Sequence, residues 1–269
     1  MHPGKTITEI ARQSRQRLAL LPEFVSEVKN WPQVLAARCG LRNLDAIEFR
    51  DGSHWRLYDL RPGLAVLREV YFERVYDAPF RLSDRGTVLD LGANVGLFTI
   101  VAAKKLVPYG RVIAVEPHPQ LAAILRQNLN QNGITNVQVL EAAASTSDGE
   151  ISLHLTPHSL GASICSQDGS SASVTVRAVS LSQIVREAGE IDLLKADIEG
   201  AEWPILFESG AEAWNSIKRI AMEFHLDSAD GRTLKDIETQ LDTLGYRNIR
   251  FHRLPGALGY VWAERHALS

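Results

Sequence analysis

The first residues in this chain whose types and spacing suit chemistry are Asp90 and the small-residue turn from Gly92 to Gly96, which has Asn94 between its glycines. They follow the apolar run 87–91, and such a run predicts a strand buried on both faces. Glycine lets a backbone turn approach a ligand closely. The order of strand, acidic residue and turn therefore predicts a loop that a nucleoside-containing cofactor can approach.

The side chains of this turn discriminate between two cofactors. A dinucleotide-binding turn reads G-x-G-x-x-G, which keeps side chains away from a pyrophosphate, whereas Asn94 interrupts that pattern here. The carboxylate of Asp90 would also repel a pyrophosphate, but it suits an ammonium group such as that of the methionine end of S-adenosylmethionine. The turn therefore favours S-adenosylmethionine over NAD.

A second acidic residue lies where related sheets bind a ribose. Glu116 ends the β-branched run 111–115, and an acidic residue roughly twenty residues beyond the glycine turn binds the ribose hydroxyls in nucleotide-binding folds. The alternative is that Glu116 caps a helix begun by Pro117, because proline is common in the first helical turn. The spacing favours the ribose contact.

A third group of polar residues follows another apolar run. Lys195, Asp197 and Glu199 lie at and just beyond the end of the run 191–196, and ligands bind at this edge of open α/β sheets. Charges placed there cost several kcal/mol each, on the order of the desolvation penalty of a buried ion, unless they are paired or used. For Lys195 the alternative is a salt bridge to Asp192 or Glu199.

Glu223 and His225 alternate at the end of the run 219–224, so they share one face of a strand. A histidine at this edge could accept a proton from a substrate hydroxyl, or it could be a hydrogen-bonded core residue. Together with Asp197 and Glu199 the two side chains could instead hold a divalent cation such as Mg²⁺. The sequence leaves both uses open. The candidate catalytic residues are Asp197, His225, Lys195 and Glu199, and the candidate metal ligands are Asp197, Glu223 and His225.

Strands and helices alternate from residue 87 onward, which predicts a parallel sheet with right-handed crossovers. The predicted strands are 87–91, 111–115, 137–142, 191–196 and 219–224, with helices at 97–106, 119–132, 181–188 and from 203. The segments 246–252 and 259–264 predict a terminal hairpin around Pro255-Gly256, preceded by an amphipathic helix over 233–244.

Two further segments frame this core. Apolar residues at helical spacing from Thr6 to about Leu41, interrupted at Pro22 and Pro32, predict two or three short helices, and Asp51-Gly52 predicts a hairpin between 46–50 and 54–58. Helical spacing resumes over 64–75. A Ser/Gly-rich loop from Thr156 to Ser173 lies between two alternating strands, and it is a candidate lid or substrate contact.

Composition narrows the class of protein. A chain of 269 residues with 45% hydrophobic residues accommodates one large α/β domain with an elaboration. The net charge of −3 and the lack of a long basic run disfavour nucleic acid as a partner. Cys39 and Cys165 make no disulfide framework, and arginines interrupt the N-terminal apolar residues, so neither a signal peptide nor a membrane span is predicted. These features indicate a cytoplasmic protein.

Taken in order, several motifs resemble the FkbM family of S-adenosylmethionine-dependent methyltransferases. The resemblance covers roughly residues 86–225, about half of the chain, and the first eighty residues lie outside it. It implies an α/β, doubly wound class I methyltransferase sheet of seven mostly parallel strands with the last antiparallel. The motifs are Val88-Leu89-Asp90-Leu91-Gly92-Ala93-Asn94-Val95-Gly96, Val115-Glu116-Pro117, Asn128 with Asn130, Asp192-Leu193-Leu194-Lys195-Ala196-Asp197-Ile198-Glu199-Gly200-Ala201-Glu202 and Glu223-Phe224-His225.

The resemblance also implies roles. Members are typically O-methyltransferases that act on hydroxyls of sugars, glycolipids or polyketide-type natural products. One departure is Ala196, where the family usually has valine or isoleucine, and the catalytic base does not transfer. The implied cofactor contacts are Asp90, Gly92, Asn94 and Gly96 for the methionine end, Glu116 for the ribose, and the strand end Glu141-Ala142-Ala143 near the adenine, with Asp197 at the same edge.

These motifs predict a methyltransferase domain over 63–269, which takes a small-molecule or glycan hydroxyl as acceptor. Residues 1–62 form an N-terminal helical and hairpin extension that would cover the active site or make a homodimer contact. Two alternatives remain. An NAD-dependent oxidoreductase would also use Glu116, and a catalytically inactive scaffold would keep the same fold.

Overall fold

The structure is a computed structural model in which residues 20–80, 82–155, 162–163, 172–226, 231–254 and 256–265 are described. Three predicted features lie outside these residues: the first part of the N-terminal helical segment, most of the loop from Thr156 to Ser173, and Cys165. Within the described part of the chain, no helix combines the length and apolar character needed to cross a membrane.

The core is a seven-stranded sheet in the order β12-β13-β11-β10-β3-β4-β5. Strand β13 runs antiparallel to both of its neighbours, and the other pairings are parallel. This is the predicted class of fold, with the antiparallel strand last in the chain. The strands are β3 (Thr87–Leu91), β4 (Arg111–Val115), β5 (Val137–Leu140), β10 (Leu193–Ala196), β11 (Arg219–His225), β12 (Tyr246–Arg253) and β13 (Leu258–Arg265).

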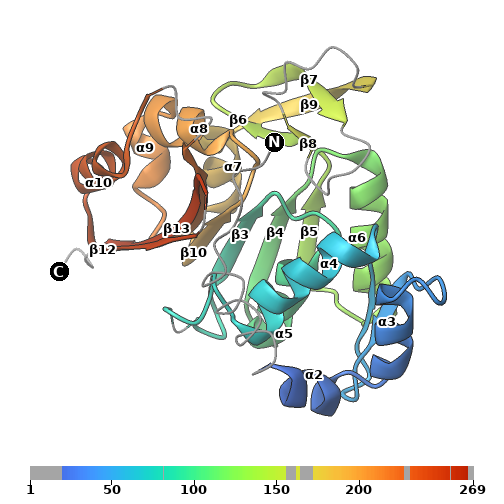
Figure 1. Cartoon of the computed structure of the whole chain (residues 1–269). Helices are drawn as coiled ribbons and strands as arrows, with labels where there is room; N and C mark the ends of the chain where they lie inside the picture. The colour runs from blue at the N-terminus through green and yellow to red at the C-terminus, as the bar shows by residue number, and fades with distance from the viewer. Residues whose placement is uncertain are drawn as a thin grey trace.

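Helices cover both faces of this sheet, because apolar side chains alternate along the buried strands. Leu89 and Leu91 face a core shared with the later helices, whereas Val88 faces the core of the earlier ones. Figure 1 shows α4, α5 and α6 together on one side, and α8, α9 and α10 beside β12 and β13. The helices are α5 (Leu97–Leu106), α6 (Pro119–Gln131), α7 (Leu181–Ala188), α8 (Glu202–Glu208), α9 (Ala211–Trp214) and α10 (Leu234–Thr243).

A second, smaller sheet has the order β6-β9-β7-β8, and Figure 1 shows it as a layer at the top of the molecule. Its strands are β6 (Ala143–Ser145), β7 (Gly149–Leu155), β8 (Ala162–Ser163) and β9 (Ala172–Ser180). The strand predicted over 137–142 is therefore wrong at its end. The chain leaves the edge of the main sheet after Leu140 and pairs from Ala143 with β9 instead.

The N-terminal elements begin with two helices, α2 (Leu21–Glu27) and α3 (Trp31–Arg38). Proline is the second residue of each helix, so Pro22 and Pro32 lie in first turns rather than only interrupting a helix. The predicted hairpin is confirmed, with β1 (Ala46–Glu48) paired antiparallel to β2 (His54–Arg56). The predicted helical stretch over 64–75 consists of α4 (Leu60–Leu67) followed by a π-helix, η1 (Arg68–Phe72).

Two asparagines, one on α6 and one at its C-terminal cap, attach this hairpin to the main sheet. Buried Asn128 accepts a hydrogen bond from the Arg56 N–H (2.7 Å) and donates to the carbonyls of Arg56 (3.0 Å) and Val95 (2.8 Å). Asn132 makes the corresponding pair with the N–H and carbonyl of His54. The hairpin residue Trp55 also shares one apolar core with Val95. The division into an extension over residues 1–62 and a methyltransferase domain over 63–269 stays a prediction.

We expect Asn128→Ala to destabilise the protein by about 2–4 kcal/mol, because it leaves one N–H and two carbonyls without their partner in a buried site. Urea unfolding followed by circular dichroism measures this loss. Asn130→Ala is the matched control, since Asn130 is on the same helix but exposed. Equal midpoints for the two variants would contradict the role of Asn128.

Candidate active site

A cleft opens at the carboxyl edge of the main sheet, and its empty space is about 930 Å³, part of it open to solvent. Pockets of roughly 300–1,000 Å³ are typical for small molecules and cofactors. The loop after β3 and the residues after β4 form one wall, and Gly63, Val66 and Val70 from α4 and η1 form another. Ala143, Ala144 and Leu153 of the small sheet close the far end.

The glycine turn is shaped by protein contacts as well as by the cleft. Gly92 has φ +74°, and a Cβ added to it would overlap the carbonyl oxygen of Asp197. Gly96, at φ +89°, begins α5 and does not line the cleft. Gly92 and Asn94 do line it, and Asn94 also has a positive φ of 54°. The sequence predicted that a ligand approaches the backbone of this turn closely. At Gly92 the group in close approach is instead the backbone of the loop after β10.

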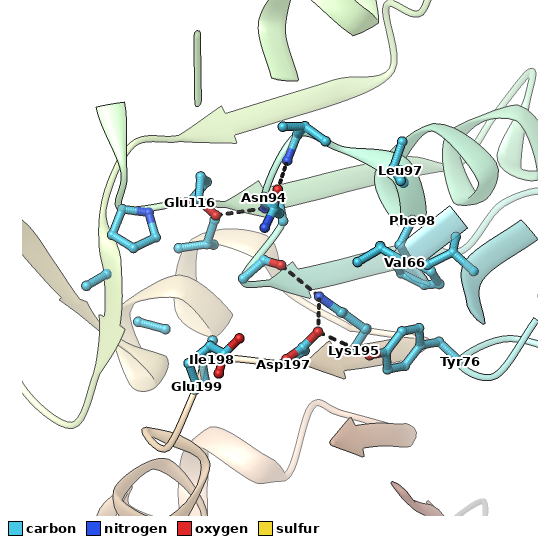
Figure 2. Close-up of a pocket in the computed structure, with 18 of the residues that line it drawn as sticks. Val66, Tyr76, Asn94, Leu97, Phe98, Glu116, Lys195, Asp197, Ile198 and Glu199 are labelled. Atoms are coloured by element: carbon cyan, nitrogen blue, oxygen red, sulfur yellow. Dashed lines mark hydrogen bonds and ion pairs between the residues drawn. The ribbon is translucent and has the colours of Figure 1, made fainter. Parts of the chain in front are cut away.

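Glu116 lies at the end of β4, as predicted, and lines the cleft. One carboxylate oxygen accepts a hydrogen bond from the Asn94 N–H (2.7 Å) and the other from the His118 N–H (2.8 Å). Burial raises the pKa of Glu116 to about 7, although these two bonds favour the ionised form. Figure 2 shows the bond from Asn94. Each oxygen keeps a second lone pair, so the carboxylate can accept hydrogen bonds from a bound diol.

Lys195 and Asp90 form a buried ion pair across neighbouring strands. They are direct partners in the register of β10 and β3, and the Lys195 Nζ lies 3.1 Å from Asp90 Oδ1. Lys195 also donates to the carbonyls of Gly92 (2.8 Å) and Leu91 (3.3 Å). Burial lowers the pKa of Lys195, but Asp90 and Asp197 raise it by more, so the ammonium stays charged. The pair thereby fixes the start of the glycine turn.

These contacts correct two predictions. Asp90 is fully buried, and its other oxygen accepts a hydrogen bond from the Thr99 hydroxyl (2.6 Å), so it does not face the cleft as a partner for an ammonium group. The expected salt bridge of Lys195 to Asp192 or Glu199 is also wrong, because Asp192 pairs with Lys218. Lys195 lines the cleft but binds the turn, which is a positioning role.

Asp197 is the carboxylate that faces the cleft from the end of β10, and its side chain is 31% exposed. The hydroxyl of Tyr76 lies 3.2 Å from Asp197 Oδ2 and 3.2 Å from Glu223 Oε2. Figure 2 shows Tyr76 directed at Asp197 beside Lys195. Burial raises the pKa of Glu223 to about 8, and the charge of Asp197 adds to the effect. The predicted residues Asp197 and Glu223 are therefore brought together.

His225 is surrounded by carboxylates. Its Nδ1 lies 3.4 Å from Glu202, and its Nε2 lies 3.6 Å from Glu199 and 4.0 Å from Glu223. Burial lowers the pKa of His225, but the hydrogen bond and charge of Glu202 and the other two carboxylates raise it to about 9. At neutral pH the ring is therefore protonated and cannot accept a proton. It also does not line the cleft, so the structure does not support the prediction that His225 is the base.

The loop between Asp197 and α8 places Glu199 at the mouth of the cleft, with φ +50° and a side chain that is 48% exposed. Buried Glu202 holds this loop by accepting hydrogen bonds from the N–H groups of Ile198 (2.9 Å) and Gly200 (2.8 Å). Burial raises the pKa of Glu199, and the neighbouring charge of Asp197 adds to this.

The predicted metal site finds no support. Among the described residues, no group of three or more histidine, cysteine, aspartate or glutamate side chains is arranged to hold a metal ion. The physical reason at Asp197, Glu223 and His225 is that the Tyr76 hydroxyl lies between the two carboxylates and that His225 is protonated. The divalent cation is not proposed further.

Of the predicted adenine contacts Glu141, Ala142 and Ala143, only Ala143 lines the cleft. Glu141 pairs with Arg126 on α6 (2.7 Å) at the surface, and Ala142 is buried in the core of the sheet. Neither side chain lines the cleft, whereas Ala143 and Ala144 do. The reason is the early end of β5, which turns the next residues toward the small sheet.

Sequence reasoning missed the wall contributed by α4, η1 and Tyr76. The segment lies before the recognisable motifs, and its helical spacing predicted packing only. The π-helix itself was not predictable from spacing, although π-helical turns are frequent at functional sites. The Trp262 indole, which donates to the Val75 carbonyl (2.8 Å), fixes the position of Tyr76 from strand β13.

The chain matches the model of the methyltransferase FkbM domain over residues 90–248, more than half of its length. The chain belongs to the FkbM methyltransferase family. The resemblance drawn from the motifs is thereby confirmed, and the protein is a methyltransferase. Membership removes the support for the alternative of an NAD-dependent oxidoreductase.

Similar proteins include two named methyltransferases. Methyltransferase sdnD of Sordaria araneosa is 27% identical over 191 residues, which cover 59% of this chain and 73% of that protein. Methyltransferase 1 of Beauveria bassiana (strain ARSEF 2860) is 25% identical over 204 residues, covering 67% and 80%. The crystal structure of methyltransferase FkbM from Methylobacillus flagellatus KT aligns with a TM-score of 0.50 at 18% identity, over 73% of this chain and 47% of that one. This last match supports the fold alone.

We expect Lys195→Met to destabilise the methyltransferase by about 3–5 kcal/mol, because it leaves Asp90 buried without its cation. The double variant Lys195→Met/Asp90→Leu should lose less than the single one. Denaturant unfolding measures both. Lys218→Met is the control, since its surface pairs contribute only about 0–1 kcal/mol. A loss in Lys195→Met no larger than in this control would refute the importance of the buried pair.

Proposed function

We propose that this methyltransferase transfers a methyl group from S-adenosylmethionine to a hydroxyl of a sugar, glycolipid or polyketide-type natural product. The observation that carries the proposal is that residues suited to a nucleoside and a carboxylate suited to be a base line one cleft at the sheet edge. Glu116 and the glycine turn suit a nucleoside, and the carboxylate of Asp197 lines the same cleft. The FkbM membership of the chain supports the same reading.

The residues of the cleft suit the proposed cofactor in separate regions. Glu116 would bind the ribose hydroxyls through the free lone pairs of its two oxygens. The apolar surface of Ala143, Ala144 and Leu153 would accept the adenine. The backbone of Gly92 and Asn94 would lie along the methionine end. When bound, S-adenosylmethionine supplies an electrophilic methyl group on a sulfonium.

Asp197 is the residue that we assign as the base. It is the carboxylate at the end of β10 that lines the cleft, and Tyr76 and the backbone bond from its own N–H to the Leu91 carbonyl (3.1 Å) fix its position. Asp197 would take the proton of the acceptor hydroxyl as that oxygen bonds to the methyl carbon and the carbon–sulfur bond breaks, with S-adenosylhomocysteine as the leaving group. Alignment of two reactants can lower the barrier by roughly 7–11 kcal/mol, and a positioned base typically adds about 10²–10⁴-fold.

The acceptor side of the cleft is formed by apolar residues. It is lined by Val66 and Val70 from α4 and η1 and by Leu97 and Phe98 from α5. Such a surface excludes water from the reacting hydroxyl and strengthens electrostatic interactions nearby. It suits an acceptor that presents a hydroxyl beside an apolar ring or chain.

Binding of S-adenosylmethionine or S-adenosylhomocysteine should strengthen as the pH rises through about 7. The pKa of Glu116 is about 7, and its ionised form is the better acceptor for ribose hydroxyls, so affinity should increase by about three- to tenfold between pH 6 and 8. Glu116→Gln should remove this pH dependence. Calorimetry measures both, with NAD as a parallel ligand. Binding of NAD alone, or of neither nucleoside, would reject the proposed cofactor.

Asp197→Asn should lower the rate of methyl transfer by about 10²–10⁴-fold, since the amide cannot accept the proton, while cofactor affinity stays within about twofold. Transfer of a labelled methyl group to a panel of sugars, glycolipids and polyketide-type alcohols is the measurement. Glu141→Gln is a control on the surface pair with Arg126, away from the cleft. Wild-type turnover in Asp197→Asn would show that another group is the base.

A further inference from the structure

Two groups that line the cleft, Asp197 and Tyr76, form a short hydrogen-bonded series with Glu223, which does not line it. The Tyr76 hydroxyl lies 3.2 Å from Asp197 Oδ2 and 3.2 Å from Glu223 Oε2. A tyrosine hydroxyl has one proton to donate and lone pairs to accept with. It cannot donate to both carboxylates at once, so a complete series requires that one of them carries a proton.

The environment keeps Tyr76 in the form that such a series needs. Its side chain is buried, and burial together with the charges of Asp197 and Glu223 raises the pKa of Tyr76 well above its usual value. The hydroxyl therefore keeps its proton and can both donate and accept. The Tyr76 ring makes edge-to-face contacts with the rings of Phe98 and Tyr260, with distances between ring centroids of 5.6 Å and 5.7 Å.

We propose that Tyr76 and Glu223 form a proton relay behind Asp197. The proposal rests on the proposed function, in which Asp197 takes the proton of the acceptor hydroxyl. The Asp197 carboxyl then donates its proton to the Tyr76 oxygen while the Tyr76 O–H passes its own proton to the ionised Glu223. This leaves an ionised Asp197, an unchanged tyrosine and a neutral Glu223, so the proton count balances and the base is restored.

A relay matters here because a bound cofactor and acceptor would cover Asp197 and separate it from water. Glu223 does not line the cleft. Its Oε1 lies 4.0 Å from His225 Nε2, which lies 3.6 Å from Glu199, and the Glu199 side chain is 48% exposed. Glu223 thereby takes the proton away from the cleft, into a cluster of charged groups that ends at the half-exposed Glu199.

The protonation of Glu223 depends on groups from several elements. Burial raises its pKa, the carboxylates on neighbouring segments raise it further, and the protonated His225 lowers it, with the result near 8. A pKa near neutrality allows Glu223 to accept and release a proton in each cycle. The charged and titratable groups that face it are Asp197, His225, Glu69, Glu199, Lys195, Tyr76 and Tyr260.

The first test follows Tyr76 itself and needs no acceptor. The chain has six tyrosines, so labelling their ζ-carbons with ¹³C gives a simple NMR spectrum in which Tyr76→Phe identifies the signal of Tyr76. We expect this signal to change between pH 6 and 10 with a midpoint near 8, as Glu223 loses its proton. Glu223→Gln should abolish the change.

Tyr260→Phe is the matched control, because it removes a hydroxyl from the neighbouring ring in the same aromatic cluster. In this variant the Tyr76 signal should still change with pH, with a midpoint within about half a pH unit of the wild-type midpoint. A Tyr76 signal that does not change with pH, or that titrates equally in Glu223→Gln, would overturn the relay.

The second test measures turnover with whichever hydroxyl compound accepts most labelled methyl in the acceptor panel. Tyr76→Phe should lower kcat by about 10–100-fold and leave the KM for S-adenosylmethionine unchanged, while Tyr260→Phe keeps wild-type kcat. In the wild type, kcat should rise through pH 8, and this rise should vanish in Glu223→Gln. Wild-type kcat in Tyr76→Phe would overturn the relay. Failure of cofactor binding in calorimetry would instead count against the proposed function. The NMR test uses neither cofactor nor acceptor, so its result does not depend on that function.

Discussion

The buried ion pair between Lys195 and Asp90 is the interaction on which the rest of the site depends. Two ions removed from water at the centre of a sheet would each cost several kcal/mol, on the order of the penalty for burial, if they were separated. Their position as direct partners on β10 and β3 makes them compensate each other. Lys195 then has hydrogen bonds left for the carbonyls of Leu91 and Gly92, and these hold the turn that forms the cleft.

This arrangement couples the two halves of the site. The turn after β3 and the loop after β10 are in such close contact that a side chain at Gly92 would overlap the carbonyl of Asp197. The proposed cofactor surface and the proposed base are therefore fixed against each other by backbone contact. A near-attack geometry requires this kind of rigidity, since small displacements of the reacting groups raise the barrier.

Acidic side chains beyond this pair make different contributions because their surroundings differ. Glu116 accepts two backbone N–H bonds and keeps capacity for a diol, and Glu202 accepts two others and holds a loop. Glu223 is held beside Asp197 by one shared tyrosine hydroxyl. The donors that reach each glutamate thus set its role: Glu202 supports a loop, Glu116 is proposed to bind the cofactor, and Glu223 is proposed to accept a proton.

The sequence by itself determined the α/β class, the antiparallel last strand, the family and the positions of Gly92, Glu116 and Asp197, because these depend on local periodicity and on motifs within single strand-to-loop segments. Only the tertiary structure decided the partners of the charged residues. Lys195 pairs with Asp90, 105 positions away in sequence, through strand register. His225 becomes protonated because Glu199 and Glu202 from another segment join Glu223 of its own strand around it. Tyr76 had no motif at all. Its role arises from packing against β11 and β13, and contacts between distant segments leave no periodic signal in the sequence.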